Sequence, residues 1–490
     1  MKPGGRARAA AAVLAWGFGL GAGGIVPAQG ASKAAAEFDW GFLASRHADA
    51  DGVVRFKAAG PIWERAVSPS TNALAVRPFY ATDTDPASGW RHYNYAWPVG
   101  EAARLGDALS WRVLLAWGTD YNLKDPHSRY RTWWLPFYFE GRDAAGRTYH
   151  AVFPFGGNLR EFYGRDIQFV LFPIWAKSSI NGVETRDWLF PIYSTTHGKG
   201  VDRFRVAPFY GYSKLAGSFD KRFVLWPFYT QVRYDFPHSK GFGYLVFPLW
   251  GHLKLSDQES WMIVPPFFRF AHGQDLDFVL APWPFVQWQA GQRSRFYLWP
   301  LFGRTVQPAV EDSFALWPIY HHEKIDRDRS ILRRYRVMPF VYYDTERLRY
   351  RRAPGGGDLV AGRFELWPLA SWERDGGARR FRCPDLWPGR DLPPIARSWA
   401  PLWTLADYRA QGANADFELL WGLFRRASRG SEMARTSLFP LVEWGGDRRG
   451  GADASSWSLL KGLCARSRDG LNTRWRVLYF LTFGTGESAR

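Results

Sequence analysis

The chain has 490 residues, of which 18% are aromatic and 27 are tryptophan, and a formal net charge of +18. So much apolar surface excludes a disordered chain, and beyond the N-terminus no apolar run approaches the roughly 20 residues of a membrane-spanning helix. Lys and Arg are spread over many turns instead of clustering on one face, so nucleic acid is not an expected partner. The charge favours solvated turns or attraction to anionic lipid head groups or surface polysaccharide.

Residues 1–30 have the parts of a secretory signal. Lys2, Arg6 and Arg8 give a basic start, the stretch 9–26 is apolar and glycine-rich, and small residues surround Ala28. No cysteine lies near that position, which argues against a lipid-anchored N-terminus. We therefore predict that the protein is exported and that residues 1–30 are removed.

A lead segment follows at residues 31–52 and contains a short acidic motif. Asp49-Ala50-Asp51-Gly52 resembles a fragment of a calcium-binding loop. The segment lacks the later ligands and the distal bidentate Glu of such loops. A polar turn is therefore the favoured interpretation.

Residues 53–343 form a regular repeat, represented by Arg222–Asp235, which reads RFVLWPFYTQVRYD. An apolar run leads to a Trp-Pro-aromatic centre, and an alternating polar tail follows. Successive centres lie 16 to 21 residues apart up to Pro339, and so regular a period indicates a repeat architecture. These centres are Pro61, Pro78, Pro98, Ala116, Pro136, Pro154, Pro173, Pro191, Pro208, Pro227, Pro248, Pro265, Pro284, Pro300, Pro318 and Pro339.

The repeat then changes character. Residues 344–362 are basic and glycine-rich, which predicts a flexible loop. Residues 363–490 continue the same array in a degenerate form, with centres at Pro368, Pro388, Pro401, Gly422, Pro440, Gly462 and Phe480.

Each unit is predicted to be strand. Val, Ile, Thr and aromatic residues dominate, and no helical stripe of apolar residues is present. Turn-formers such as Asn181-Gly182 separate the units and supply the positive φ angles that hairpins need. One turn per period leaves strands of about 10–12 residues, which would run antiparallel as a meander.

The central proline of each unit has two interpretations. It marks a bulge that bends one long strand of a closing sheet, or it is itself the turn between two short strands, since proline donates no ladder hydrogen bond. In the Pro227 unit one face stays apolar from Val224 to Tyr234, and this continuity through the proline favours the bend.

The predicted fold is therefore all-β: an antiparallel meander of about 20 or more strands, closed as a large barrel. Closure would remove the exposed edges of so many apolar strands. The expected strand length also suits the 9–11 residues of a tilted membrane-spanning strand. The alternative is a soluble array of stacked short β-hairpins.

Candidate chemical groups are few. Cys383 and Cys464 could pair, remain free or be inert, and Cys464 holds a repeat position usually taken by an aromatic residue, which favours a buried structural thiol. His321-His322-Glu323 is the nearest approach to a metal pair. Adjacent strand residues point to opposite faces, so these two histidines are not expected to share an ion.

Carboxylates in turns could meet as an acid/base pair, but nothing in the sequence fixes their separation. They are Asp275, Asp277, Asp326 and Asp328. No nucleophile elbow, phosphate-binding loop or metalloprotease motif is present. We predict no catalytic, cofactor-binding or metal-binding residues and no enzymatic activity.

The Leu-Trp-Pro-Leu-Phe style of repeat resembles that of exported bacterial proteins without indicating a family. We expect an outer-membrane protein of the β-barrel type, with a structural, transport or assembly role and with membrane lipid or anionic surface polysaccharide as partner. The alternative is a soluble periplasmic or secreted repeat protein that binds a glycan or a protein through its aromatic faces. Aromatics at a fixed strand position are more often core or membrane-interface residues than sugar platforms.

Overall fold

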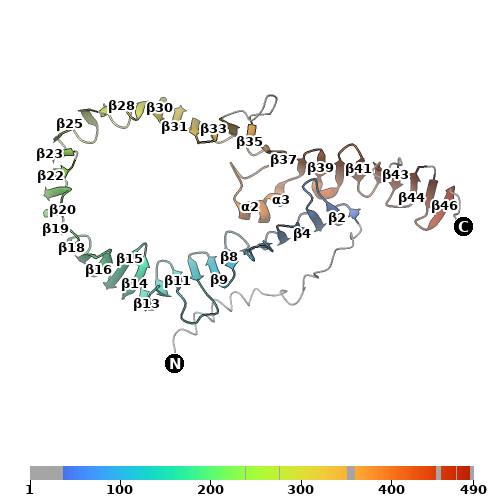
Figure 1. Ribbon diagram of the computed structural model, residues 1–490, viewed down its shortest axis with the longest axis horizontal. Coiled ribbons are helices and arrows are strands. Elements are labelled where there is room, and N and C mark those ends of the chain that lie inside the picture. The colour runs from blue at the N-terminus through green and yellow to red at the C-terminus, as the bar shows by residue number, and fades with distance from the viewer. Residues whose placement is uncertain are drawn as a thin grey trace. The chain divides into compact units, whose positions relative to one another are not determined.

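The computed structural model of the protein describes residues 37–237, 239–274, 276–349, 359–447, 454–470 and 472–485. The expected signal at 1–30 and Asp275 lie outside these ranges. The described chain is almost entirely strand, and its 46 strands form one sheet in which each strand pairs antiparallel with the next (Figure 1).

The first ten strands are short and lie between residues 38 and 120. They are β1 (Phe38–Trp40), β2 (Ala44–Ala48), β3 (Val54–Ala58), β4 (Trp63–Val67), β5 (Asn72–Val76), β6 (Tyr80–Thr84), β7 (Arg91–Tyr95), β8 (Gly100–Leu105), β9 (Ala108–Val113) and β10 (Ala116–Asp120).

The central strands follow the regular repeat. They are β11 (Tyr130–Trp134), β12 (Tyr138–Arg142), β13 (Thr148–Val152), β14 (Gly156–Phe162), β15 (Arg165–Val170), β16 (Trp175–Ile180), β17 (Val183–Trp188), β18 (Tyr193–Gly198), β19 (Val201–Val206), β20 (Tyr210–Leu215), β21 (Phe219–Val224), β22 (Tyr229–Phe236), β23 (Ser239–Val246), β24 (Trp250–Leu255), β25 (Gln258–Ile263), β26 (Phe268–Gly273), β27 (Leu276–Leu280), β28 (Val286–Gly291), β29 (Ser294–Leu298), β30 (Phe302–Gln307), β31 (Val310–Ala315), β32 (Tyr320–Asp326), β33 (Ser330–Val337) and β34 (Val341–Leu348).

The last part contains the described helices as well as strands. Its elements are β35 (Leu359–Leu366), β36 (Ala370–Asp375), β37 (Ala378–Cys383), α2 (Pro393–Ser398), α3 (Ala400–Trp403), β38 (Ala406–Gln411), β39 (Asn414–Leu419), the 3-10 turn η1 (Leu420–Gly422), β40 (Phe424–Arg429), β41 (Met433–Leu438), β42 (Val442–Asp447), β43 (Ala454–Leu459), β44 (Cys464–Asp469), β45 (Asn472–Val477) and β46 (Leu481–Thr485).

The central proline of each repeat is the turn, so the bent-strand interpretation is wrong. Around Pro227, strand β21 ends at Val224 and β22 begins at Tyr229. The Phe228 N–H donates a hydrogen bond of 2.8 Å to the Leu225 carbonyl, and the bond before Pro227 is cis. A proline in this turn does not remove a hydrogen-bond donor from the strand ladder, which explains why the sequence tolerates proline so often.

Each period therefore contains two turns and two short strands. The second turn is the one that its residues predict: Ile180 pairs with Val183 across Asn181-Gly182, and both turn residues have positive φ, as a two-residue hairpin requires. Strands of about 10–12 residues were expected, but β21 has 6 residues and β22 has 8.

The all-β antiparallel meander is confirmed, but its closure into a barrel is not found. Within the described chain, β1 pairs with β2 and β46 with β45, and no ladder joins the first strand to the last. The alternative of stacked short hairpins fits this sheet. Its physical basis is that every strand finds its ladder partner one turn away in sequence.

Two segments differ from the expected repeat. Part of the interval 344–362, expected to be a loop, is strand, because Glu346 of β34 pairs with Ala361 of β35; residues 350–358 lie outside the described ranges. Near the expected centres Pro388 and Pro401, a loop and the helices α2 and α3 interrupt the strands. Pro393 and Pro394 open α2, where proline is tolerated because the first turn of a helix has unpaired N–H groups. Among the described residues, no helix is both long and apolar enough to cross a membrane.

Candidate functional site

The sheet has two edges, and its turns alternate between them. Because each period contributes two strands, every proline turn lies on the same edge, about 10 Å from the next one. Adjacent proline turns are also hydrogen-bonded: the Leu225 N–H donates to the Phe209 carbonyl at 2.6 Å, and the Phe247 N–H donates to the Phe228 carbonyl at 2.7 Å. We call this row of turns the proline rim.

The proline rim exposes large apolar side chains. Trp226 is 61% exposed and Phe228 is 59% exposed. The same pattern continues along the row. The exposed apolar residues of the other turns include Phe79, Val99, Leu114, Phe137, Phe155, Leu171, Leu189, Phe209, Leu249, Phe267, Phe285, Leu301, Leu316, Phe340, Leu369, Leu441, Leu460 and Phe480.

The opposite edge is mostly polar, although isolated apolar side chains such as Leu105 and Tyr163 are exposed there. Its turns are built from residues such as Asn181-Gly182, Lys199-Gly200, Ser256-Asp257 and Gln292-Arg293. The side chains therefore divide along the strand direction: apolar at one end and polar at the other. This asymmetry was missed from the sequence, because placing the proline in mid-strand put its aromatic neighbours in the interior of the sheet.

A second feature joins distant parts of the sheet. Residues 38–97 pack against residues 395–439, and we call these contacts the clasp. Arg409 contacts Asp49 at 3.0 Å, Arg397 contacts Asp83 at 2.9 Å, and Trp399 Nε1 donates to the Trp97 carbonyl at 2.8 Å. Further pairs are Lys57–Glu418 at 2.5 Å and Ser437–Asp39 at 2.8 Å.

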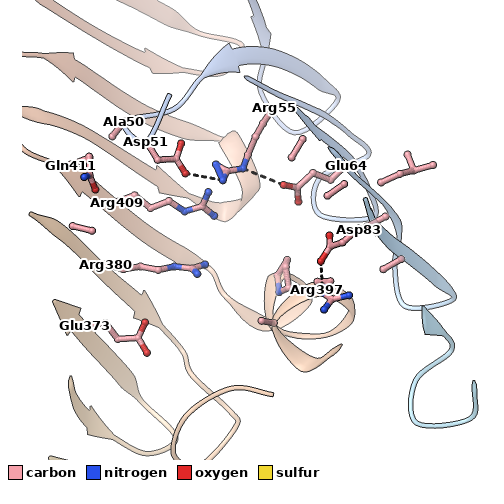
Figure 2. A pocket seen from close by; sticks show the side chains of 18 of the residues that line it. Ala50, Asp51, Arg55, Glu64, Asp83, Glu373, Arg380, Arg397, Arg409 and Gln411 are labelled. Atoms are coloured by element: carbon pink, nitrogen blue, oxygen red, sulfur yellow. Dashed lines mark hydrogen bonds and ion pairs between the residues drawn. The ribbon is translucent and has the colours of Figure 1, made fainter. Parts of the chain in front are cut away.

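The clasp contains a cavity of 450 Å³. Eight alanines line it, and their short side chains leave the space between the two walls: Ala50, Ala66, Ala73, Ala75, Ala81, Ala378, Ala396 and Ala410. Figure 2 shows the charged groups around this space, with Arg55 paired to Asp51 and Glu64, and Arg397 paired to Asp83.

The charges of the cavity are nearly balanced. Six arginines (Arg55, Arg77, Arg379, Arg380, Arg397 and Arg409) face five carboxylates (Asp51, Glu64, Asp83, Glu373 and Asp375). Burial would raise the pKa of Glu64, but the positive charges of Arg77, Lys57, Arg55 and Arg409 outweigh it and lower that pKa to about 2. In the same way, the partners Asp407 and Asp49 outweigh burial and raise the pKa of Arg409 above its usual range. Such mutual pairing holds the strands together and leaves a surplus of only one positive charge in the cavity lining.

The acidic motif of the lead segment lies in the clasp. Asp49 and Asp51 occupy the turn between β2 and β3. Both pair with Arg55, and Asp49 also pairs with Arg409. The described residues contain no group of three or more His, Cys, Asp or Glu side chains placed to hold a metal ion.

The other candidate residues remain apart. His321 pairs with Asp312 at 2.7 Å, whereas His322 stacks on Tyr335 and Glu323 pairs with Arg334 at 2.9 Å. Three neighbouring residues of one strand thus have three different partners.

The turn carboxylates and the cysteines are also separated. Asp277 pairs with His272 at 2.6 Å, and Asp326, five strands away, pairs with Lys324 at 3.3 Å. Cys383 ends β37 and Cys464 begins β44; both are free and partly buried.

The clasp was also missed from the sequence. Its ion pairs join residues 314 to 361 positions apart, and no local pattern reports such a distance. One weak signal is present in the strands that build the clasp. They carry Ala and charged residues, as in NALAV of β5 and ADYRAQ of β38, whereas the strands of the central repeats carry aromatic residues. No protein-family model and no curated protein matches this chain.

Proposed function

We propose that the protein is an exported structural protein of the outer membrane that lies on the lipid surface with its proline rim inserted. The observation that supports this is the rim itself. The largest apolar patch of an ordinary soluble monomer covers about 300–600 Å². Two or three half-exposed aromatic or aliphatic side chains per turn leave roughly 200 Å², so three adjacent turns already reach that limit.

The depth of the apolar zone supports lying on the membrane. Around Pro300 the zone runs from Phe296 to Phe302, and Arg295 and Arg304 lie beyond its two ends. Its three residues on β29, Phe296 to Leu298, extend about 10 Å. That depth matches interfacial insertion, in which an apolar face enters about 5–10 Å, and is well short of a span of about 30 Å.

The energetics require several turns together. At about 25 cal/mol per Å², burying roughly 200 Å² stabilises the bound state by about 5 kcal/mol per turn. Association itself costs about 4–15 kcal/mol, so a single turn is marginal and a row of them binds firmly. A repeated rim with one orientation meets this requirement.

Vesicle flotation of the chain without residues 1–30 tests the proposal. The rim variant carries Trp226→Gln, Leu249→Gln and Phe267→Gln in three adjacent proline turns. The control variant carries Leu105→Gln, Tyr163→Gln and Phe236→Gln, which remove exposed apolar side chains at the opposite edge.

We expect the unaltered chain and the control variant to float with vesicles, and the rim variant to bind at least about 10-fold more weakly, a loss of about 1.4 kcal/mol. Equal binding by both variants would contradict the proposal. A chain that ignores vesicles and is retained on polysaccharide resin would instead support the soluble glycan-binding alternative.

A further inference from the structure

The charged residues are distributed unevenly between the two edges of the sheet. Over residues 130–345, the twelve windows within six residues of each rim proline, Pro136 to Pro339, contain 19 Lys and Arg and 7 Asp and Glu, a net charge of +12. The remaining residues of the same stretch, at the other edge, contain 7 Lys and Arg and 12 Asp and Glu, a net charge of −5.

The alternating turns give this count a spatial meaning. Consecutive strands are antiparallel, so residues near a proline lie near the rim edge whichever strand carries them. The excess positive charge therefore forms a band directly above the apolar zone, and the excess negative charge lies at the far edge.

Several cations of this band make no ion pair with a carboxylate among the described residues. They are exposed, and they lie on strands β19, β21, β22, β24 and β33: Arg203, Lys221, Arg233, Lys254 and Arg333. In the clasp, by contrast, arginines such as Arg409 are matched by buried carboxylates. The band thus offers charge that the protein itself does not neutralise.

We propose that the basic band selects anionic phospholipid head groups; this rests on the proposed insertion of the rim. The unpaired cations lie five or six residues from their proline, and a rise of about 3.3 Å per residue places their Cα atoms at most about 20 Å from the rim. Long Lys and Arg side chains bury their stems and keep the charge in the head-group layer. The acidic far edge points away from the anionic surface.

The band sets both the lipid preference and the orientation. Each Lys or Arg close to an anionic leaflet contributes about 1 kcal/mol. The electrostatic attraction to the leaflet falls off within a Debye length of about 10 Å, so only cations near the rim contribute strongly. A cation at the far edge should contribute little to binding.

Flotation with two vesicle types tests this inference: phosphatidylcholine alone, and phosphatidylcholine mixed with phosphatidylglycerol. The band variant carries Arg203→Gln, Lys221→Gln, Arg233→Gln, Lys254→Gln and Arg333→Gln. The matched control removes the same charge at or near the far edge, through Lys124→Gln, Arg165→Gln, Lys199→Gln, Lys240→Gln and Arg329→Gln.

We expect the unaltered chain to bind the anionic vesicles at least about 10-fold more tightly than the neutral ones, and added salt to reduce the difference. The band variant should lose this preference while keeping its binding to neutral vesicles, and the control should keep the preference. Equal binding of the unaltered chain to both vesicle types, or equal losses in the two variants, would overturn the inference alone. Failure to bind either vesicle would overturn the proposed function.

Discussion

Arg409 donates a hydrogen bond to Asp49 at 3.0 Å across 360 residues of chain. Asp49 is only 6% exposed, and burial would raise the pKa of its carboxyl. Its hydrogen bond with His47 and the charges of Arg55 and Arg409 prevail and hold that pKa well below its usual range. This pair connects strands that the ladder keeps far apart, so it is central to the stability of the clasp.

Arg409→Met should open the clasp. Removing one partner of a buried ion pair leaves Asp49 and Asp407 without it and costs about 3–5 kcal/mol. We expect backbone amides of β2 to β4 to exchange hydrogen with solvent about 100-fold faster or more, while those of β20 to β30 are unchanged.

Arg186→Met is the matched control, because the Arg186 side chain is 58% exposed and pairs with Glu184 in the central sheet. Exposed pairs contribute about 0–1 kcal/mol. An equal effect of the two substitutions would show that the clasp pair carries no special weight.

Acid should weaken the clasp through Glu64. Its pKa is about 2 in the folded chain against an ordinary 4.5, so the folded state binds fewer protons and its stability falls as the pH drops from about 4.5 towards 2. The change corresponds to roughly 3 kcal/mol. In the Glu64→Gln variant, the stability of β4 measured by hydrogen exchange should no longer depend on pH across this window. An unchanged pH dependence in the variant would refute the assignment to Glu64.

Glu365 should have the opposite effect on the pH dependence of stability. Burial outweighs the attraction of Arg363 and raises the pKa of Glu365 to about 7. The folded state therefore holds a proton that the unfolded chain releases, and local stability falls as the pH rises from about 4.5 to 7.

The reporter for Glu365 is the Gly389 amide, which donates to its carboxylate at 3.0 Å. Exchange of this amide should accelerate with pH beyond its intrinsic rate, and Glu365→Gln should abolish the excess. A retained excess in the variant would assign the effect to another group.

Asn94 offers a test of an unpaired polar group. Its side chain is fully buried, and neither amide atom has a hydrogen-bond partner within the structure. Burying such a group costs about 1–3 kcal/mol, so Asn94→Leu should stabilise the protein against urea by a similar amount. Destabilisation would show that the amide has a partner such as an ordered water.

The repeat was the most predictable part of the fold. Each central position from Pro61 to Pro339 lies in or beside a turn, and Asn181-Gly182 forms the hairpin that its residues indicate. Alternation and turn chemistry are local properties, so the sequence reports them directly. The choice between a bend and a turn at Pro227 was wrong, because the alternation of apolar and polar faces is the same for a bent strand as for two strands joined by a turn.

The candidate sites were less accessible. Asp49 and Asp51 were noticed as a possible calcium fragment, whereas their partner Arg409 is separated from them by almost the whole sheet. The interruption at α2 and α3 was also missed, because Pro401 was expected to be a degenerate repeat centre although its segment is helical. Contacts set by long-range folding leave little trace in short windows of sequence.

The alternating turns also impose a rule of parity on how such a chain can lengthen or shrink. Inserting or deleting one whole repeat, which is two strands, leaves every later proline turn on its original edge. Losing a single strand such as β21 would reverse all later strands and carry their exposed aromatics to the acidic side. Viable length variants of this protein should therefore differ by even numbers of strands.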